Sequence, residues 1–477
     1  MNASYNERGK MMMSGKIKKK KIIIGALIVI VIAIGMYPVI SKKALTFSNR
    51  VGNKVFKLKN PDAITIYALS YNGKLDVDIE PIVNEFKAKY PNEKINIVKF
   101  DENDNGFQKY SKSILSDTLA GEGPDIIYCN TVYTNARAFQ KSGLLCDLKP
   151  YIEKDKDFNK EDYDSKLLNT GLYKGKLTFV PVDYYVPAYI TTKELLEKNN
   201  VKLDSNMTQN DFIKAAAGYI SQAKNTNGKN LFAASIDVGQ FIASSGFECI
   251  DYDNRKMNFD KPEFKNIMEN YKKIYNSTPK PTNNTSGEEG LQGIKNGSTL
   301  FSTDQSYAYG SEIFNSESLI KSLTGQTQII NSFPTYNGGN KTIAIVGDLI
   351  GMSKKTKNKK AAYDFIKVAL SEKTQSGDKF YAPPINKKAQ IDVKNEYSKK
   401  WVGKKDREYE KVTLQAPSDD LNKYYDKITN KVDEVKILDS DVDKLIQDCM
   451  APYFEGKSSY DSALKTLENK VKLYINE

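Results

Sequence analysis

The chain of 477 residues contains no histidine, one tryptophan and four cysteines. Without histidine, Ser-His-Asp and Cys-His catalysis and every histidine-ligated metal site are excluded. No Gly-x-x-x-x-Gly-Lys-Ser/Thr stretch occurs, so the chain is not a P-loop ATPase. The cysteines are scattered and form no Cys-x-x-Cys pair, which indicates buried apolar residues rather than a disulfide framework. We therefore expect no cofactor and no metal site. The four are Cys129, Cys146, Cys249 and Cys449.

Positive charge is concentrated at the N-terminus. The net charge is +12, but residues 1–43 hold nine basic residues and one acidic residue, so only four net positive charges remain for the rest. A large domain with so small an excess of positive charge is not a basic nucleic-acid-binding domain. We therefore expect no nucleic-acid partner.

A run of 19 residues without charge, Ile22–Ile40, has about the length of a bilayer-spanning helix. Seven basic residues precede it, against four in the 14 residues that follow, so the positive-inside bias puts the N-terminus in the cytoplasm. The alternative is a cleaved secretory signal, but its apolar core would be unusually long and Val39-x-Ser41 is a poor cleavage motif. We predict a basic cytoplasmic tail (1–21), a transmembrane anchor (22–40) and a stalk (41–62), with the main domain outside the cell.

Beyond residue 62 the apolar pattern alternates between short strands and helices. Strands are predicted at 64–69, 95–100 and 125–130, with helices at 79–90 and 110–119 between them. The third strand is apolar at its centre, as buried parallel strands are. This β-α-β-α-β order indicates an α/β domain on a parallel sheet. The length of the chain indicates a second domain, because single cores rarely exceed about 300 residues.

The stretch from Tyr173 to Lys198 predicts a crossing between two domains. An apolar strand, Leu177–Val182, is followed by an aromatic connector, Asp183–Tyr185, which two prolines flank. Prolines at these positions prevent a helix or a central strand from running through the connector. Because ligand sites favour clefts between domains, we expect a site at this crossing.

The same stretch resembles bacterial extracellular solute-binding proteins of ABC importers (family 1), which include oligosaccharide receptors. Gly175-Lys176-Leu177 with Pro181 resembles the family's strand leading to the hinge, and Tyr189–Leu196 resembles the strand and helix that follow it. The resemblance covers about residues 62–477. Its other motifs are Ala120–Ile127, Lys141–Leu145, Asp147–Ile152, Met207–Phe212, Lys357–Gln375, Tyr381–Lys388 and Phe454–Lys457.

The resemblance implies a two-lobed, periplasmic-binding-protein-like α/β fold of type II, with a mainly parallel sheet flanked by helices in each lobe. We expect an N-terminal lobe of residues 63–185 with 300–350 and a C-terminal lobe of 186–299 with 351–477. The lobes would close on a small solute, in the first place a carbohydrate, for delivery to the permease subunits of an ABC importer. We expect a monomer without enzyme activity.

Open α/β sheets bind ligands beyond the carboxyl ends of their strands. The resemblance puts ligand contacts after the first strand, after the third strand, at the crossing and after a strand at 297–303. Any single tyrosine among the candidate residues can equally be a packing residue with a hydrated hydroxyl group. The single Trp401 lies in a charged stretch, although sugar receptors of this family usually carry more tryptophan. The candidate ligand-binding residues are Tyr71, Tyr128, Asn130, Asp183, Tyr184, Tyr185, Asp304, Tyr307, Tyr309, Tyr336 and Asp348.

Two other interpretations stay open. Carboxylate pairs such as Glu288-Glu289 and Asp419-Asp420 would suit a secreted carbohydrate-active enzyme, although adjacent acids are usually solvated surface. A sensory or adhesive module without transport would have the same pattern. Residues 101–106 (DENDNG) resemble the start of a calcium loop, but Lys112 stands where a bidentate glutamate is needed, so we expect a polar turn there.

Overall fold

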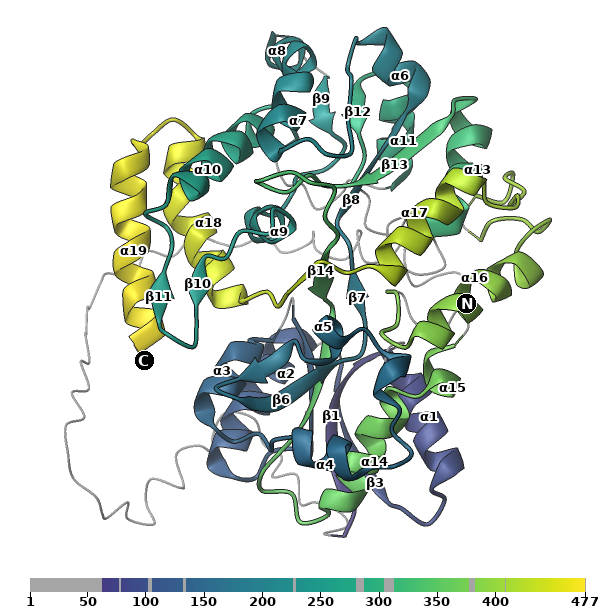
Figure 1. Cartoon of the computed structure of the whole chain (residues 1–477), viewed down its shortest axis with the longest axis vertical. Coiled ribbons are helices and arrows are strands. Elements are labelled where there is room, and N and C mark those ends of the chain that lie inside the picture. Colours follow the sequence, from purple (N-terminus) through teal and green to yellow (C-terminus); the bar gives the residue numbers. More distant parts are fainter. Residues whose placement is uncertain are drawn as a thin grey trace, which may run out of the picture. The chain divides into compact units, whose positions relative to one another are not determined.

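The computed structural model of the chain describes a large part of the sequence beyond residue 61. The tail and anchor predicted at 1–40 lie outside this part, as do all but the last residue of the stalk. Within the described residues no helix is long and apolar enough to cross a membrane. The segment Asp62–Glu477 is a single unit in which two lobes can be distinguished (Figure 1). The described residues are 62–76, 79–101, 105–131, 134–225, 229–279, 287–303, 313–376, 382–407 and 409–476.

The first lobe is built on a seven-stranded sheet with the order β2-β1-β4-β15-β6-β5, in which β3 also pairs with β1. Strands β1, β3 and β4 are parallel, as predicted, but β15 runs antiparallel to both of its neighbours. The sheet is therefore mixed rather than mainly parallel, because β15 enters it at the edge where the parallel strands end. The strands are β1 (Ile64–Tyr71), β2 (Lys74–Leu75), β3 (Ile95–Asp101), β4 (Ile126–Asn130), β5 (Gly171–Tyr173), β6 (Lys176–Pro181) and β15 (Asp348–Met352).

Helices cover both faces of this sheet. Alternate residues of β1 supply two cores, because successive side chains of a strand point to opposite faces. Ile64 and Ile66 pack with α1, α4, α5 and α14, whereas Tyr67 and Leu69 pack with α2 and α3. Helix α2 ends at Gly121, whose φ of +84° favours glycine. The helices are α1 (Glu80–Lys89), α2 (Gly106–Ala120), α3 (Ala136–Ser142), α4 (Lys149–Lys154), α5 (Ser165–Leu168), α14 (Lys359–Ala369) and α15 (Glu372–Gln375).

The second lobe holds two short sheets around an aromatic core. Strands β8 (Ala188–Thr192) and β13 (Gln328–Ser332) are antiparallel, and β9 (Asn230–Phe232) and β12 (Thr299–Phe301) are parallel. The rings of Tyr189, Phe212 and Phe301 meet at centroid distances of 5.0 to 5.2 Å. The surrounding elements are α6 (Lys193–Lys198), α7 (Gln209–Ala215), α8 (Ala217–Asn225), α9 (Val238–Ser244), β10 (Ile250–Asp251), β11 (Lys256–Met257), α10 (Pro262–Tyr275), α11 (Gly287–Asn296) and α13 (Ile313–Thr324).

The strand pairing divides the chain between the lobes differently from our prediction. We placed 300–350 in the first lobe, but β12 pairs with β9 in the second. We placed residues from 351 onward in the second lobe, but α14 packs with α1 in the first. The physical reason is pairing and burial: all three residues of β12 are buried beside β9, and α14 buries most of its residues in the core of the first lobe.

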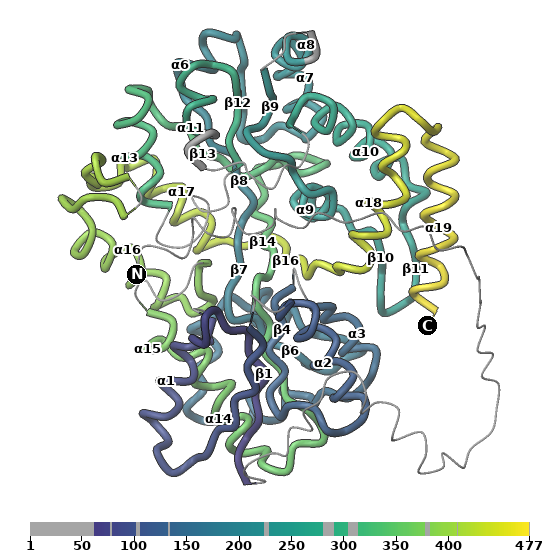
Figure 2. Tube along the Cα trace, turned by 180° about the vertical axis from the view of Figure 1, so that it is seen from behind, coloured from purple at the N-terminus to yellow at the C-terminus, as the bar shows by residue number. Residues whose placement is uncertain are grey.

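Three short strands lie between the lobes, namely β7 (Tyr184–Tyr185), β14 (Ile343–Val346) and β16 (Glu434–Lys436). Figure 2 shows β7 and β14 from behind, between the two lobes. On one side of them lie α16 (Lys387–Lys400) and α17 (Asp419–Asn430). The C-terminal helices α18 (Ser440–Phe454) and α19 (Tyr460–Asn476) are amphipathic and bury their apolar faces in the second lobe.

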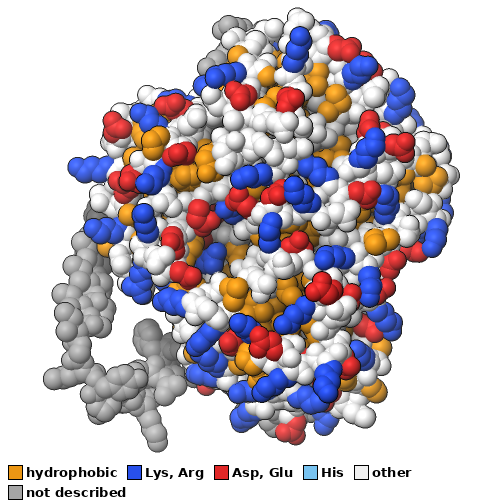
Figure 3. Space-filling view, in the orientation of Figure 1, with side chains coloured by type: hydrophobic (Ala, Val, Ile, Leu, Met, Phe, Trp, Pro, Cys, Tyr) orange, Lys and Arg blue, Asp and Glu red, His pale blue; other side chains and the backbone are white. Residues whose placement is uncertain are grey.

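Basic and acidic side chains are interspersed over the face of the described residues that Figure 3 shows. On this face no large area is dominated by one sign of charge. The distribution agrees with the small net charge of the main domain.

Candidate ligand-binding site

Two segments carry the chain across the carboxyl edge of the first-lobe sheet. Strand β6 continues through Asp183 into β7, and β14 continues through Gly347 into β15. Strands β7 and β14 are antiparallel, with Tyr185 opposite Ile345. A Cβ atom on Gly347 would lie 2.4 Å from Oδ1 of Asp183, so a larger residue at 347 would displace the Asp183 carboxylate. The crossing is therefore a tightly packed connection, not a loose linker.

Four of the candidate residues meet at this edge. Asp348 is the register partner of Asn130, so that the start of β15 lies beside the end of β4. The hydroxyl group of Tyr128 donates to Oδ2 of Asp348 at 2.9 Å, and the backbone N–H of Asp348 donates to Oδ1 of Asp183 at 2.9 Å. The structure thus brings together Tyr128, Asn130, Asp183 and Asp348 from β4, the β6–β7 connector and β15, which are far apart in the sequence.

The carboxyl group of Asp348 is electrostatically unusual. Burial raises its pKa well above the usual range, the neighbouring Asp183 raises it further, and the hydrogen bond from Tyr128 opposes the rise. Asp183 and Asp348 are each only 3% exposed. In this conformation the two carboxyl groups and the hydroxyl group of Tyr128 form a buried polar cluster, which we call the polar floor.

The two crossover tyrosines have different surroundings. Tyr184 is fully buried; its hydroxyl group donates to the carbonyl oxygen of Ile428 at 3.0 Å and accepts from Nε2 of Gln390 at 3.1 Å. Tyr185 is 6% exposed and packs on the opposite side with Ala243 of α9 and with Leu438. In this conformation Tyr184 is enclosed by Gln390 of α16 and Ile428 of α17, and its part in ligand binding stays a prediction.

The remaining candidates lie farther out or outside the described residues. Tyr71 is half-buried at the end of β1, opposite Lys74 in the short β1–β2 hairpin. Tyr336 is half-buried in the second lobe and packs its ring edge-on against Phe247 at 5.8 Å. Asp304, Tyr307 and Tyr309 fall in 304–312, a segment that the structure does not describe.

No metal centre is found in the described part of the chain. No group of three or more cysteine, aspartate or glutamate side chains there could hold an ion. Of the acidic turn at 101–106 only the ends are described, and Oδ2 of Asp101 accepts the backbone N–H of Gly73 at 3.1 Å. That contact ties the turn to the β1–β2 hairpin.

Comparison with protein-family models matches residues 73–376 to the bacterial extracellular solute-binding protein model. This match covers more than half of the chain and includes the crossing and the polar floor. The chain belongs to the bacterial extracellular solute-binding protein family. Comparison with curated protein sequences found no match.

Solved structures share the fold of this solute-binding protein. A substrate-binding protein from Listeria monocytogenes, in complex with cycloalternan, is 18% identical, with a TM-score of 0.55 over 87% of this chain and 99% of the other. A galacto-N-biose/lacto-N-biose-binding protein from Bifidobacterium longum is 18% identical, with a TM-score of 0.56 over 87% and 98%. The sugar-binding protein MalE from Xanthomonas citri is 14% identical, with a TM-score of 0.57 over 86% and 97%. At these identities the likeness establishes a mixed α/β, two-lobed, periplasmic-binding-protein-like fold.

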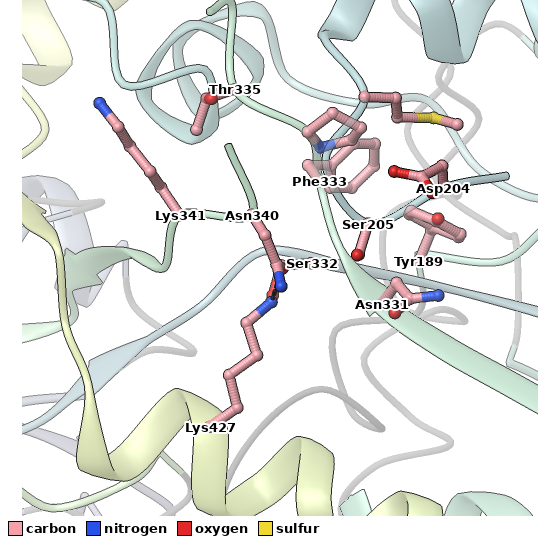
Figure 4. Close-up of a pocket in the computed structure, with 12 residues that line it drawn as sticks. Tyr189, Asp204, Ser205, Asn331, Ser332, Phe333, Thr335, Asn340, Lys341 and Lys427 are labelled. Atoms are coloured by element: carbon pink, nitrogen blue, oxygen red, sulfur yellow. Dashed lines mark hydrogen bonds between the residues drawn. The ribbon is translucent and has the colours of Figure 1, made fainter. Parts of the chain in front are cut away.

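The solute-binding protein has a further polar pocket, which no candidate residue among the described ones lines. Lys427 extends from α17 toward Asn340 and Ser332 (Figure 4) and donates to Oδ1 of Asn340. Burial lowers the pKa of Lys427, and Asp433 opposes that effect. The lining residues are Tyr189, Asp204, Ser205, Met207, Asn331, Ser332, Phe333, Pro334, Thr335, Asn340, Lys341 and Lys427.

Sequence reasoning missed one polar cluster of this solute-binding protein. Asn135, Tyr252, Asp439 and Tyr474 are joined by hydrogen bonds, although Asn135 and Tyr474 are 339 positions apart. The one local signal was that Asn is a common helix-capping residue, which is the role of Asn135 at the start of α3. The pattern around the other three residues is that of ordinary surface helices and turns.

Proposed function

We propose that this protein is the extracellular receptor of an ABC importer and that its solute is a carbohydrate. The match of residues 73–376 to the solute-binding family carries the proposal, because that match includes the crossing where the two lobes meet. The similar proteins from Listeria monocytogenes and Bifidobacterium longum were solved with cycloalternan and lacto-N-biose. Their ligands support a sugar as the solute here.

The solute binds between the lobes, beyond the carboxyl edge of the first-lobe sheet. Tyr185 supplies a flat apolar ring and a hydroxyl group, which suit the C–H face and the hydroxyl rim of a sugar. Closure around the solute then presents a defined surface to the permease. The proposed contacts are Tyr71, Asn130, Tyr185, Asp304, Tyr307, Tyr309 and Tyr336 above a floor of Tyr128, Asp183 and Asp348.

The protein binds its sugar and does not cleave it. The matched family is one of solute-binding receptors, which supports this part of the proposal. Asp419 and Asp420, which we considered as a hydrolytic pair, are exposed in the first turn of α17. If the protein hydrolysed a chromogenic glycoside, it would be a carbohydrate-active enzyme and not a receptor.

The receptor is held at the outer face of the cell membrane by residues 22–40. The uncharged run of 19 residues and the basic tail before it support this anchor. The main domain then works as a monomer beside the permease, and a separate ATPase supplies the energy for transport.

A thermal-shift screen of the full chain in detergent tests the proposal. Oligosaccharides, peptides and polyols are added separately, because a ligand that binds only the native state stabilises it by RT ln(1 + [L]/Kd), about 2.7 kcal/mol at a hundredfold excess over Kd. We expect a shift with one class of oligosaccharide. A shift with peptides alone would show that the solute is a peptide and not a carbohydrate. Uptake of the identified solute by whole cells would then distinguish a transport receptor from a sensory or adhesive module.

A further inference from the structure

The lobes touch at a second place, away from the crossing strands. Helix α3 of the first lobe faces three elements of the second, namely the β10–β11 hairpin, the start of α18 and the end of α19 (Figures 1 and 2). The cluster is formed by Asn135, Arg137 and Lys141 on the first lobe and by Tyr252, Asp439, Asp441 and Tyr474 on the second. We call it the α3 contact.

A buried carboxylate, Asp439, organises the second-lobe half of the contact. Its Oδ2 accepts the hydroxyl group of Tyr252 at 2.6 Å and that of Tyr474 at 2.8 Å. Its Oδ1 accepts the backbone N–H of Val442 and so caps α18. Because Asp439 is only 5% exposed and joins three elements, this half is a rigid surface.

Asn135 links the first lobe to that surface through its amide nitrogen. Its Oδ1 accepts the backbone N–H of Ala138 at 3.0 Å and caps α3, so the amide NH2 must point away from the helix. Nδ2 lies 2.6 Å from Oδ2 of Asp441, 3.2 Å from Oδ1 of Asp439 and 3.0 Å from the hydroxyl oxygen of Tyr474. The cap therefore presents a donor to three second-lobe oxygens.

Two cations one helical turn apart cover the two tyrosine rings. The guanidinium of Arg137 lies 4.6 Å from the centroid of the Tyr252 ring, and Nζ of Lys141 lies 4.5 Å from that of Tyr474. Nζ of Lys141 also donates to the carbonyl oxygen of Tyr474 at 2.8 Å, near the end of α19, where a cation is favourable. All three first-lobe residues thus bind second-lobe groups.

We propose that the α3 contact is a latch that fastens the two lobes together and so favours the closed form, which bound solute stabilises further. This inference rests on the proposed function, because it assigns the closed form to a receptor that opens and closes. Every interaction in the latch is between protein groups, so the latch acts in the solute-free chain as well. A receptor whose closed form is already partly populated loses less affinity to the conformational change, because the solute then has a smaller difference in free energy between the open and closed forms to overcome.

Energy transfer between dyes on the two lobes of the solute-free full chain tests the latch. Dyes are attached to cysteines that replace the exposed Lys87 of α1 and Lys214 of α7, in a background with Cys249→Ser, because Cys129, Cys146 and Cys449 are buried. The main variant is Asn135→Asp. It keeps the capping oxygen but replaces the donor by a carboxylate facing Asp439 and Asp441, so we expect a lower transfer efficiency.

Matched variants separate the latch from general damage. Asn358→Asp makes the same change at the cap of α14, where the side-chain oxygen accepts only the N–H of Ala361, and should leave the efficiency unchanged. Adding Asp441→Asn to Asn135→Asp restores one donor–acceptor pair and should recover part of the efficiency.

The second test variant, Lys141→Met, keeps most of the side chain and removes the charge. It should also lower the transfer efficiency, and it serves if Asn135→Asp folds poorly. An efficiency equal to that of the parent in both Asn135→Asp and Lys141→Met would overturn the latch. Since no sugar is present, that result says nothing against a carbohydrate solute, which the thermal-shift screen decides separately.

Discussion

Two neighbouring tyrosines show how strongly surroundings decide the role of a residue. We predict that Tyr185→Ala weakens solute binding by about 1–2 kcal/mol, or roughly five- to thirtyfold, because it removes the ring at the crossing. Tyr184→Phe should leave the affinity unchanged and lower the free energy of unfolding by about 1 kcal/mol, since the hydroxyl group bonds to Ile428 and Gln390. Calorimetric titration and urea unfolding of both variants test this. A loss of affinity in Tyr184→Phe alone would place the site on the other side of the crossing.

The buried Asp348 predicts an unusual dependence of stability on pH. Burial and Asp183 raise its native pKa, whereas in the unfolded chain it is about 3.9. Above that value the unfolded chain loses the proton before the native one, so this residue lowers stability as pH rises, until the native pKa is reached. Asp348→Asn should therefore raise the free energy of unfolding at pH 7.5 by about 1–3 kcal/mol.

The measurement for Asp348 is urea unfolding at pH 7.5 and at pH 4. The gain from Asp348→Asn should shrink at pH 4, where the native form keeps its proton and the unfolded chain, with a pKa of about 3.9, is only about half ionised. The control is Asp420→Asn, since that side chain is 94% exposed. An equal gain at the two pH values would show that the charge of Asp348 is not the cause.

At the scale of elements, an ion pair fastens α14 to the end of α4. Nζ of Lys367 lies 2.8 Å from Oδ2 of Asp155, and the two side chains are only 18% and 13% exposed. Burial raises the pKa of Asp155, but hydrogen bonds from Lys367, the backbone and Tyr363 outweigh it, so the native pKa lies below the usual value. The pair therefore stabilises the fold above the unfolded pKa of about 3.9, and this contribution is lost as pH falls through the native pKa.

We predict that Lys367→Met lowers the free energy of unfolding at pH 7 by about 1–3 kcal/mol, the range for hydrogen bonds to charged groups. The matched control is Lys360→Met on the same helix, because Lys360 is 80% exposed in its pair with Asp364 and should cost at most about 0.5 kcal/mol. Denaturant unfolding of both variants at pH 7 and pH 3 gives the comparison. A loss in Lys367→Met that is as large at pH 3 would point to packing rather than charge.

At the scale of the whole molecule, we predict that residues 22–40 remain in the mature protein and hold it in the membrane. The physical reason is an uncharged run of 19 residues with basic residues before it and a poor cleavage motif. Fractionation followed by intact-mass analysis tests this, with the full-length mass expected in the membrane fraction. A mature species that begins near Lys42 and appears in the medium would identify a cleaved signal.

Local pattern was sufficient for much of the first lobe. The strands Ile64–Tyr71, Ile95–Asp101 and Ile126–Asn130 and the helix end at Gly121 follow from apolar periodicity and turn chemistry, which act over a few residues. In the second lobe the same local chemistry gives α7 a capping box, in which Thr208 and Asp211 bond to each other's backbone N–H groups. The membership of the solute-binding family rested on motifs of this local kind.

Contacts between distant segments decided the rest. The sequence determined that an aromatic, proline-flanked connector joins two α/β lobes, because proline and apolar runs restrict the backbone wherever they occur. It could not determine that Tyr184 is enclosed by α16 and α17, that β15 enters the first sheet antiparallel, or that Asn135 meets Asp439. Each of these depends on which surfaces pack together across some 200 to 300 positions, and that choice is made by the burial of whole faces in the folded protein.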